Sequence, residues 1–147
     1  MTEWSYKANE TLATLAQTRE LLEQDRFIAR SAYTKASAKP PLVWSVKLGH
    51  VIYVYYKEGE APLLSLGAWE VTLPKPGRDA GFVQGSGLVR VADAAFVAKW
   101  CGEGLPYTID PVLKVLTGWS LKPREDLTPP PPRWIEGGRQ TLRKYVP

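Results

Sequence analysis

The stretch VIYVYYKEGEAPLLSLGAWEVT, residues 51–72, contains the clearest strand pattern of the chain. Its first part, residues 51–56, consists only of β-branched and aromatic side chains, a composition typical of β-strands. Because the side chains of a strand alternate between its two faces, both faces of this strand are apolar or aromatic. We therefore expect it to be buried on both sides, or to line a pocket with one of them.

A second strand is predicted for residues 63–74. Trp69, Val71 and Leu73 would lie on one face, with polar or small residues on the other. Gly67 is expected to mark a bulge or a bend, since glycine within a strand often does so. The two strands most simply form an antiparallel pair across the segment that joins them.

Upstream of this pair, the sequence predicts a short strand, a helix, a loop and a further strand-like piece. Residues 3–7 alternate aromatic and polar side chains, which predicts a short strand. Residues 9–27 predict a helix with Asn9 as its N-cap. Residues 30–41 are expected to form a loop, because they contain small residues, no large aliphatic ones and a final pair of prolines. Residues 42–48 predict a further strand-like piece.

Downstream of the pair, residues 74–87 are rich in glycine and proline and predict a long surface loop. A short strand is predicted for residues 88–93. Asp93 is a suitable N-cap for a helix over residues 94–102, which ends with a glycine.

The strongest helix signal of the chain covers residues 108–119. Asp110 would be its N-cap and Pro111 its first helical residue, a favourable combination at a helix start. Residues 120–134 follow as an extended, proline-rich connector. Residues 139–147 predict a final strand.

Length and composition indicate one domain of ordinary globular type. The chain has 147 residues, of which 44% are apolar and 23% charged. One cysteine excludes an internal disulfide and favours a reducing, cytoplasmic setting. The N-terminal residues lack the features of a signal peptide. No apolar run in the sequence approaches the roughly 20 residues that a membrane helix needs, so we expect no membrane association.

Positive charge is concentrated in residues 26–57. The net charge of the chain is +4, yet this segment contains six basic residues and no acidic one. A basic segment favours anionic partners such as nucleic acid. The alternative is a solvated surface whose acids lie elsewhere in the chain. The six residues are Arg26, Arg30, Lys35, Lys39, Lys47 and Lys57.

His50, the only histidine of the chain, directly precedes the first strand of the opening stretch. It has two interpretations: a general base at the mouth of a site, or a turn residue at the start of the strand. Catalysis with a nucleophile requires Ser or Cys beside the imidazole, and no spacing indicates such a partner among Ser45, Ser86 and Cys101. We favour the turn.

Metal and cofactor sites are not expected. A zinc site needs three or four clustered ligands, and one histidine with one cysteine cannot supply them without several carboxylates. The glycines of residues 74–87 do not have the spacing of a dinucleotide-binding loop. The aromatic content is more informative, because the six tryptophans provide flat surfaces on which a base could stack.

VKLGHVIYVYY (residues 46–56), SLGAWEVT (residues 65–72) and the W-x-x-K pattern of Trp4 to Lys7 resemble the PUA-like superfamily, which includes the EVE, ASCH and YTH domains. The resemblance implies a single α+β domain over residues 1–147, built as a small, mostly antiparallel β-barrel with flanking helices. It also implies a pocket for RNA or for modified DNA bases. His50 stands where such domains usually have aspartate. The Gly-x-Lys-x-x-x-x-Arg motif of ASCH domains is absent.

These observations lead to one main hypothesis, a non-enzymatic module that binds nucleic acid or modified nucleobases in an aromatic pocket with a basic rim. The phosphate contacts are predicted at Arg26, Arg30, Lys35, Lys39 and Lys47. The stacking side chains are predicted to be Trp4, Tyr33, Trp44 and Tyr56. Two alternatives remain: a small enzyme acting on a nucleobase-like substrate with His50 as general base, and a protein-interaction module. The oligomeric state is left open.

Overall fold

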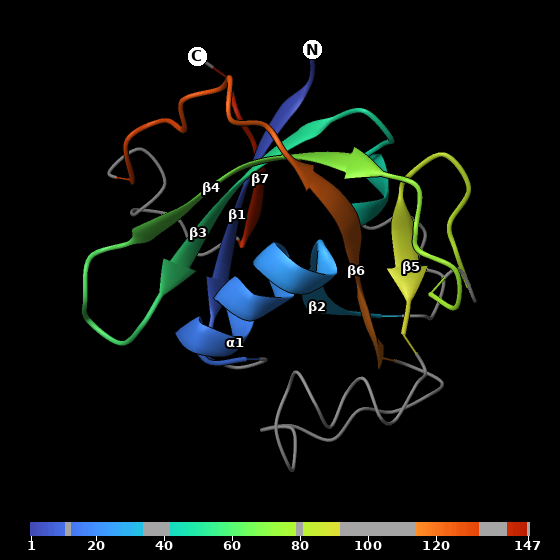
Figure 1. Ribbon diagram of the computed structural model, residues 1–147, viewed down its shortest axis with the longest axis horizontal. Coiled ribbons are helices and arrows are strands. Elements are labelled where there is room, and N and C mark those ends of the chain that lie inside the picture. Colours follow the sequence, from blue (N-terminus) through green and yellow to red (C-terminus); the bar gives the residue numbers. More distant parts are fainter. Residues whose placement is uncertain (11–12, 34–41, 79–80, 92–113, 133–140, 147) are drawn as a thin grey trace.

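The computed structural model describes residues 1–10, 13–33, 42–78, 81–91, 114–132 and 141–146, with the backbone alone at 31–33 and 114–116 (Figure 1). Their elements, in chain order, are β1 (Glu3–Asn9), the α-helix α1 (Leu15–Glu20), the π-helical turn η1 (Leu21–Asp25), β2 (Phe27–Tyr33), the 3-10 turn η2 (Leu42–Ser45), β3 (Val51–Lys57), β4 (Leu64–Thr72), β5 (Leu88–Arg90), β6 (Lys114–Pro123) and β7 (Leu142–Lys144).

The strands form one mixed sheet, in which the described residues contribute seven strands in the order β2-β6-β4-β3-β1-β7, with β5 also paired to β6. All pairs are antiparallel except β1 with β3. The predicted α+β class and the mostly antiparallel sheet are therefore confirmed. The sheet is not closed, so a barrel is not shown.

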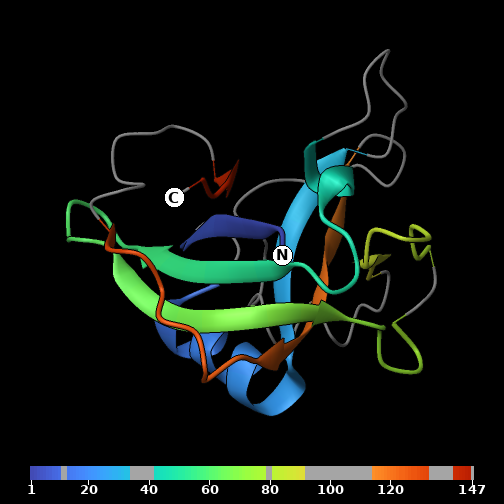
Figure 2. The same cartoon turned by 90° about the horizontal axis from the view of Figure 1, so that it is seen from above.

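The sheet curls, so that β2 and β6 run across the direction of β3 and β4 (Figure 2). The curl brings Tyr6 of β1 into contact with two strands that are not its neighbours in the sheet. Its ring on β1 lies edge-on to Trp119 on β6, with centroids 5.7 Å apart, and its hydroxyl donates to the carbonyl of Ala29 on β2 over 3.4 Å. Strands distant in the sheet order thus approach across its concave side. The side chains of α1 and η1 fill part of the space between β1 and β2, where a cavity of about 20 Å³ remains.

Strand β3 is buried on both faces, as its sequence predicts. Its residues Val51 to Tyr56 are all 3% exposed or less. The concave face, with Ile52, Val54 and Tyr56, belongs to the main core. The convex face, with Val51, Tyr53 and Tyr55, belongs to a second, smaller core.

The proline-rich segment covers part of this convex face. The hydroxyl of Tyr55 donates to the carbonyl of Pro130 over 2.6 Å, and both residues are buried. Burial raises the pKa of Tyr55, because the phenolate would lose its hydration. Of the connector predicted at residues 120–134, the first residues belong to strand β6. The rest of its described part packs against the convex face of β3.

The predicted hairpin of β3 and β4 is confirmed, including its irregularity at Gly67. The register shifts between Tyr53, which pairs with Ala68, and Tyr55, which pairs with Ser65. Gly67 lies in the resulting bulge with φ of 99°, a conformation that glycine adopts without steric cost. Leu73 lies beyond the end of β4 and is exposed, in contrast to Trp69 and Val71.

The helix predicted over residues 9–27 is shorter, and its predicted cap is wrong. Asn9 belongs to β1, where it pairs with Lys57 of β3. The N-cap is Thr14, whose hydroxyl accepts from the backbone N–H of Gln17 while the Gln17 side chain accepts from the backbone N–H of Thr14. This reciprocal capping box satisfies two backbone donors at once, which a single Asn cap does not.

Two predictions for the neighbouring segments are also corrected. Residues 30–33 were expected in a loop, but they continue β2, because each pairs with a residue of β6. Residues 42–45 were expected in a strand and form the turn η2, with Val43 buried in the core. Residues 34–41 lie outside the described part of the chain.

The strongest helix prediction, over residues 108–119, is wrong for its described half, which is strand β6. Helical spacing of apolar residues is equally compatible with a strand that is covered on both sides, and β2 pairs with the whole of residues 114–120. Gly118 makes the close approach possible: a Cβ there would overlap the Phe27 ring and the Ile28 carbonyl. Asp110 and Pro111 lie outside the described residues, as does the helix predicted at 94–102.

The short strands predicted near residues 3–7, 88–93 and 139–147 are confirmed as β1, β5 and β7. β1 extends further than predicted, to Asn9, because its whole length pairs with β3. The described part of the loop at 74–87 consists of turns, held to the body of the protein by an ion pair of 2.7 Å between Arg78 and Asp25.

Gly118→Ala is expected to reduce the free energy of unfolding by about 1–3 kcal/mol, because the added methyl group meets atoms of β2 that cannot move without shifting the strand. Chemical denaturation followed by circular dichroism measures this loss. Ser120→Ala, on the same strand, is the matched control. Ser120 is buried and its hydroxyl has no hydrogen-bond partner among the described residues, so its removal should cost little or stabilise. Equal losses in both variants would contradict this account.

Candidate nucleic-acid interface

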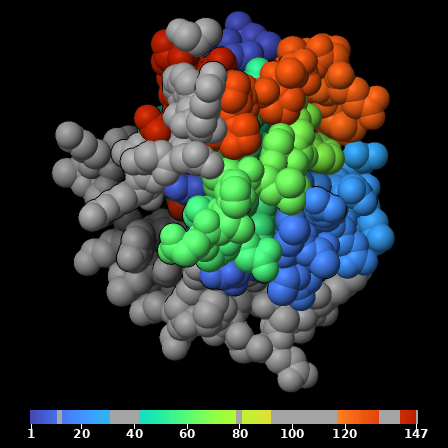
Figure 3. All heavy atoms as spheres, turned by 90° about the vertical axis from the view of Figure 1, so that its left-hand side faces the viewer, coloured from blue at the N-terminus to red at the C-terminus, as the bar shows by residue number. Residues whose placement is uncertain are grey.

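A groove lies where the end of η1, strand β4 and the turn after β6 meet. It contains two hollows of about 340 and 230 Å³, and Glu23 and Trp69 line both of them. Arg26, Arg124 and Leu127 also line the larger hollow. Figure 3 shows the three segments side by side, with η1 in blue, β4 in green and the turn after β6 in orange. We call this region the Trp69 groove.

Arg26 has an unusual backbone, and its side chain has no hydrogen-bond or ion-pair partner among the described residues. Its φ of 54° places it in the left-handed region, where no other non-glycine among the described residues lies. The Leu121 N–H donates to its carbonyl over 2.8 Å, which fixes it against β6. Its exposed guanidinium lies 5.9 Å from the centroid of the Trp69 ring and makes no hydrogen bond or ion pair with a described residue. It therefore remains available to an anion.

Trp69 is held firmly in the groove. Its indole N–H donates to the Leu66 carbonyl over 2.9 Å, and the residue is only 7% exposed. Its backbone pairs with Ile52 of β3 on one side and with Pro123 of β6 on the other. Hydrogen bonding and strand pairing thus fix the indole before any ligand arrives, which lowers the entropy lost on binding.

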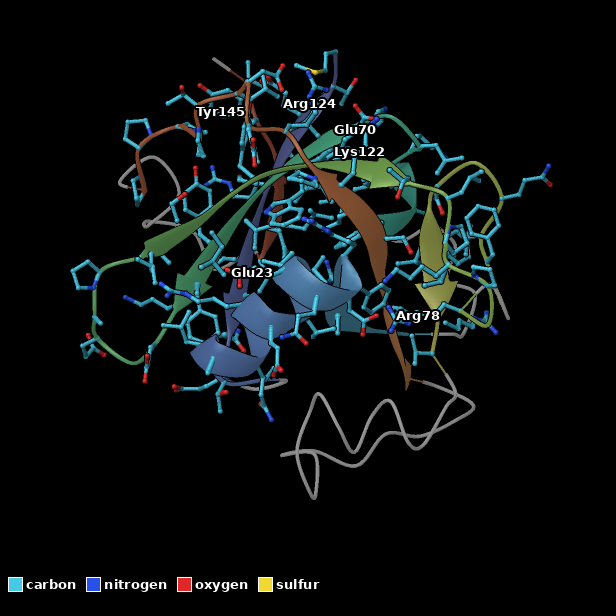
Figure 4. The ribbon with its side chains drawn as sticks, viewed as in Figure 1. Glu23, Glu70, Arg78, Lys122, Arg124 and Tyr145 are labelled. Atoms are coloured by element: carbon cyan, nitrogen blue, oxygen red, sulfur yellow. The ribbon has the colours of Figure 1, made fainter. Side chains whose placement is uncertain are left out.

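Two further charged side chains line the groove. Arg19 borders the smaller hollow, and Glu23 lies at both, near the centre of the view in Figure 4. Both side chains are exposed, and neither forms an ion pair with a described residue. With Arg26, Arg124 and Glu125, which line the larger hollow, the groove has three cationic and two anionic groups around Trp69. A ligand that carries both phosphate and hydrogen-bond donors would complement this arrangement.

Arg124 has a different role, because its guanidinium already forms hydrogen bonds with two carboxylates. Its guanidinium forms a bidentate pair with Asp126, at 2.9 Å for both contacts, and reaches Glu70 at 2.8 Å. The hydrogen bonds from Arg124 lower the pKa of Asp126 to about 2. Lys122 also contacts Glu70, at 3.2 Å, and Figure 4 shows these charges gathered at one end of β4 and β6. Arg124 thus anchors the turn that borders the groove.

The other predicted phosphate contacts are dispersed. Arg30 lies half-buried with its guanidinium 5.8 Å from the ring of Tyr6 and 6.0 Å from that of Trp119, inside the curl of the sheet. Lys47 is exposed in the turn before β3. Lys35 and Lys39 lie outside the described residues. The structure therefore does not bring the predicted set together, and Arg26 is the member that meets an aromatic ring at a groove.

The predicted stacking residues lie mostly in the core. Trp4 and Tyr56 are 3% and 2% exposed, so neither ring has a face open to a base in this conformation. Trp44 is half-buried at η2, and the side chain of Tyr33 lies outside the described set. Trp69 was not among the predicted stacking residues. Its signal in the sequence was the adjacent bulge glycine, since bulges occur next to sites more often than elsewhere.

His50 occupies a turn, as predicted. Its backbone N–H donates to the Lys47 carbonyl over 3.1 Å, and Gly49 has the positive φ of 85° that a type II turn requires at its third residue. The His50 imidazole also stabilises the turn through hydrogen bonds. Nδ1 accepts from the Lys47 backbone N–H over 3.0 Å and from the Trp4 indole N–H over 3.1 Å, and the two rings stack.

This geometry determines the protonation state of His50. Two N–H groups point at Nδ1, so Nδ1 carries no proton and the neutral ring carries its proton on Nε2. Burial lowers the pKa of His50, and the positive charges of Lys47, Lys144 and the amino group of Met1 lower it further. A general base needs a free lone pair, and the lone pair of this ring is already engaged.

The described residues provide neither a metal-binding cluster nor a membrane-spanning helix. No group of three or more His, Cys, Asp and Glu side chains there could hold a metal ion. No helix in that part of the chain has the length and hydrophobicity to cross a membrane.

Comparison with known proteins finds no matching family model, no matching curated protein and no matching solved structure. The resemblance to PUA-like domains therefore stays a prediction.

The stability of the protein is expected to fall as the pH is lowered through about 6.5, because of His50. The unfolded chain takes up a proton on this residue at its ordinary pKa, whereas the folded chain does so only at lower pH. Between these values the unfolded state binds more protons, which favours unfolding. In His50→Asn, the side-chain oxygen can accept both N–H groups without titrating. Denaturant midpoints of the two proteins between about pH 7.5 and 5 measure the difference; parallel curves would contradict the assignment.

Proposed function

We propose that the protein is a non-enzymatic module that binds nucleic acid, or a nucleobase within it, in the Trp69 groove. The observation that carries this proposal is the unpaired guanidinium of Arg26 over the indole of Trp69, beside a hollow of about 340 Å³. A hollow of this size is within the range of ligand sites in proteins.

Arginine beside an aromatic ring suits a nucleotide for two reasons. The guanidinium can bind a phosphate through two parallel N–H bonds, and its planar face can stack on a base. Trp69 is largely buried, at 7% exposed, but its fixed side chain borders both hollows at the same place. Arg19, at the smaller hollow, gives a second cation along the path that a backbone would follow.

The proposal keeps the PUA-like resemblance, in which the curled sheet corresponds to a barrel and α1 with η1 fills the space between β1 and β2. Lys47, Arg30, Lys35 and Lys39 stay predicted phosphate contacts of the basic segment, outside the lining of the groove. Trp44 would be a second stacking side chain. A groove lined by two acids, Glu23 and Glu125, as well as by cations favours single-stranded ligands, whose bases expose hydrogen-bond donors, over the uniform backbone of a duplex.

Arg26→Gly tests the proposal without endangering the fold. Glycine is the preferred residue in the left-handed conformation after a helix, so the free energy of unfolding is expected to rise by about 0.5–1 kcal/mol. Affinity for single-stranded DNA or RNA, measured by fluorescence anisotropy at low salt, is expected to fall about tenfold. The slope of log K against log salt should decrease by about 0.7, as for one lost phosphate contact.

Arg90→Gln is the matched control, since it removes one positive charge from an exposed arginine on β5 outside the groove. Equal loss of affinity in both variants would show unspecific attraction and would overturn the groove as the site. Absence of binding by the unchanged protein to any single- or double-stranded DNA or RNA, with or without methylated bases, would overturn the function. A stable protein partner in that case would favour the protein-interaction alternative.

A further inference from the structure

A second polar site lies at the turn before β3, on a different part of the chain from the Trp69 groove. It is built from the turn Lys47–His50 and from Lys144 of β7. Lys144 lies opposite Trp4 in the register of β1 and β7, so their side chains share one face of the sheet. The Trp4 indole is bonded to His50, which brings the end of β7 to the same turn.

The turn fixes which nitrogen of His50 can serve a ligand. Because Nδ1 accepts two hydrogen bonds, the proton of the neutral ring lies on Nε2. Among the described residues, Nε2 has no partner, and the imidazole is only half-buried. The protein therefore holds an oriented N–H donor at its surface, braced by Trp4 and by the backbone of Lys47.

Two lysine ammonium groups accompany this donor, in addition to the amino group of Met1. Lys47 and Lys144 are both exposed, and neither forms an ion pair with a described residue. Both lower the pKa of His50, so both charges act on the imidazole. The nearest carboxylate along β1, that of Glu3, accepts from the hydroxyl of Tyr53 on the convex face of the sheet. No anion of the described chain therefore neutralises this cluster.

We propose that the Nε2–H of His50 and the ammonium groups of Lys47 and Lys144 form a binding site for a phosphate group. The three donors match the acceptor oxygens of a tetrahedral anion, and the fixed tautomer means that the imidazole donates even when neutral. The phosphate comes either from a phosphomonoester or from the backbone of a nucleic acid. The site does not depend on binding in the Trp69 groove.

The single histidine allows a direct test by NMR, since the imidazole ¹⁵N and ¹H signals need no assignment among several rings. Inorganic phosphate is titrated into the protein near pH 7.5 at constant ionic strength, with sodium chloride as reference. The Nε2–H signal of His50 is expected to shift saturably with phosphate and not with chloride. A second titration uses a short single-stranded oligonucleotide without terminal phosphate. A shift with phosphate indicates a monoester site, and a shift with the oligonucleotide alone indicates the backbone.

Lys47→Gln and Lys144→Gln are each expected to weaken the phosphate response about two- to fivefold, as for the loss of one exposed charge pair. Lys122→Gln is the matched control, because Lys122 is exposed on β6 and forms an ion pair with Glu70. Arg26→Gly should leave the phosphate response unchanged, which separates this site from the Trp69 groove. The proposal is overturned if neither phosphate nor the oligonucleotide shifts His50 beyond the chloride reference, or if Lys122→Gln weakens the response as much as Lys144→Gln.

Discussion

Burial of β3 on both faces is the constraint on which the other elements depend. A strand with six apolar or aromatic residues in a row needs cover on each side, and one curled sheet cannot give both. The concave face is covered by α1, η1 and the far strands of the same sheet. The convex face requires chain from elsewhere, and the described structure uses Leu127, Pro130 and Tyr145. The proline-rich segment therefore belongs to the core as much as the strands do.

The sequence predicted best what is decided locally. The hairpin of β3 and β4, its bulge at Gly67 and the turn at His50 follow from neighbouring residues, and all three are present. The helix prediction over residues 108–119 was wrong for β6, because its apolar spacing fits a helix and its burial between strands could not be seen locally. Gly118 allows the close approach of β2, a role that no neighbouring residue indicates.

The candidate site was predictable only in part, for the same reason. Charge concentration singled out Arg26, but nothing in the sequence places residue 26 over residue 69. Stacking residues were chosen for their aromatic character, and Trp4 and Tyr56 proved to be core residues. Which tryptophan borders a groove depends on the curl of the sheet and on the turn after β6, and both are products of long-range pairing.

Arg26 illustrates how a local cost can indicate a function. An arginine in the left-handed conformation after a helix is less favourable than glycine by about 1 kcal/mol. The fold uses only the backbone of this residue, whose carbonyl accepts a hydrogen bond from the Leu121 N–H. The side chain adds no hydrogen bond or ion pair within the described structure, and its contact with Trp69 lies at the rim of a hollow. Stability alone would therefore favour glycine at this position. This local cost is one reason for the binding role that we propose for Arg26 in the Trp69 groove.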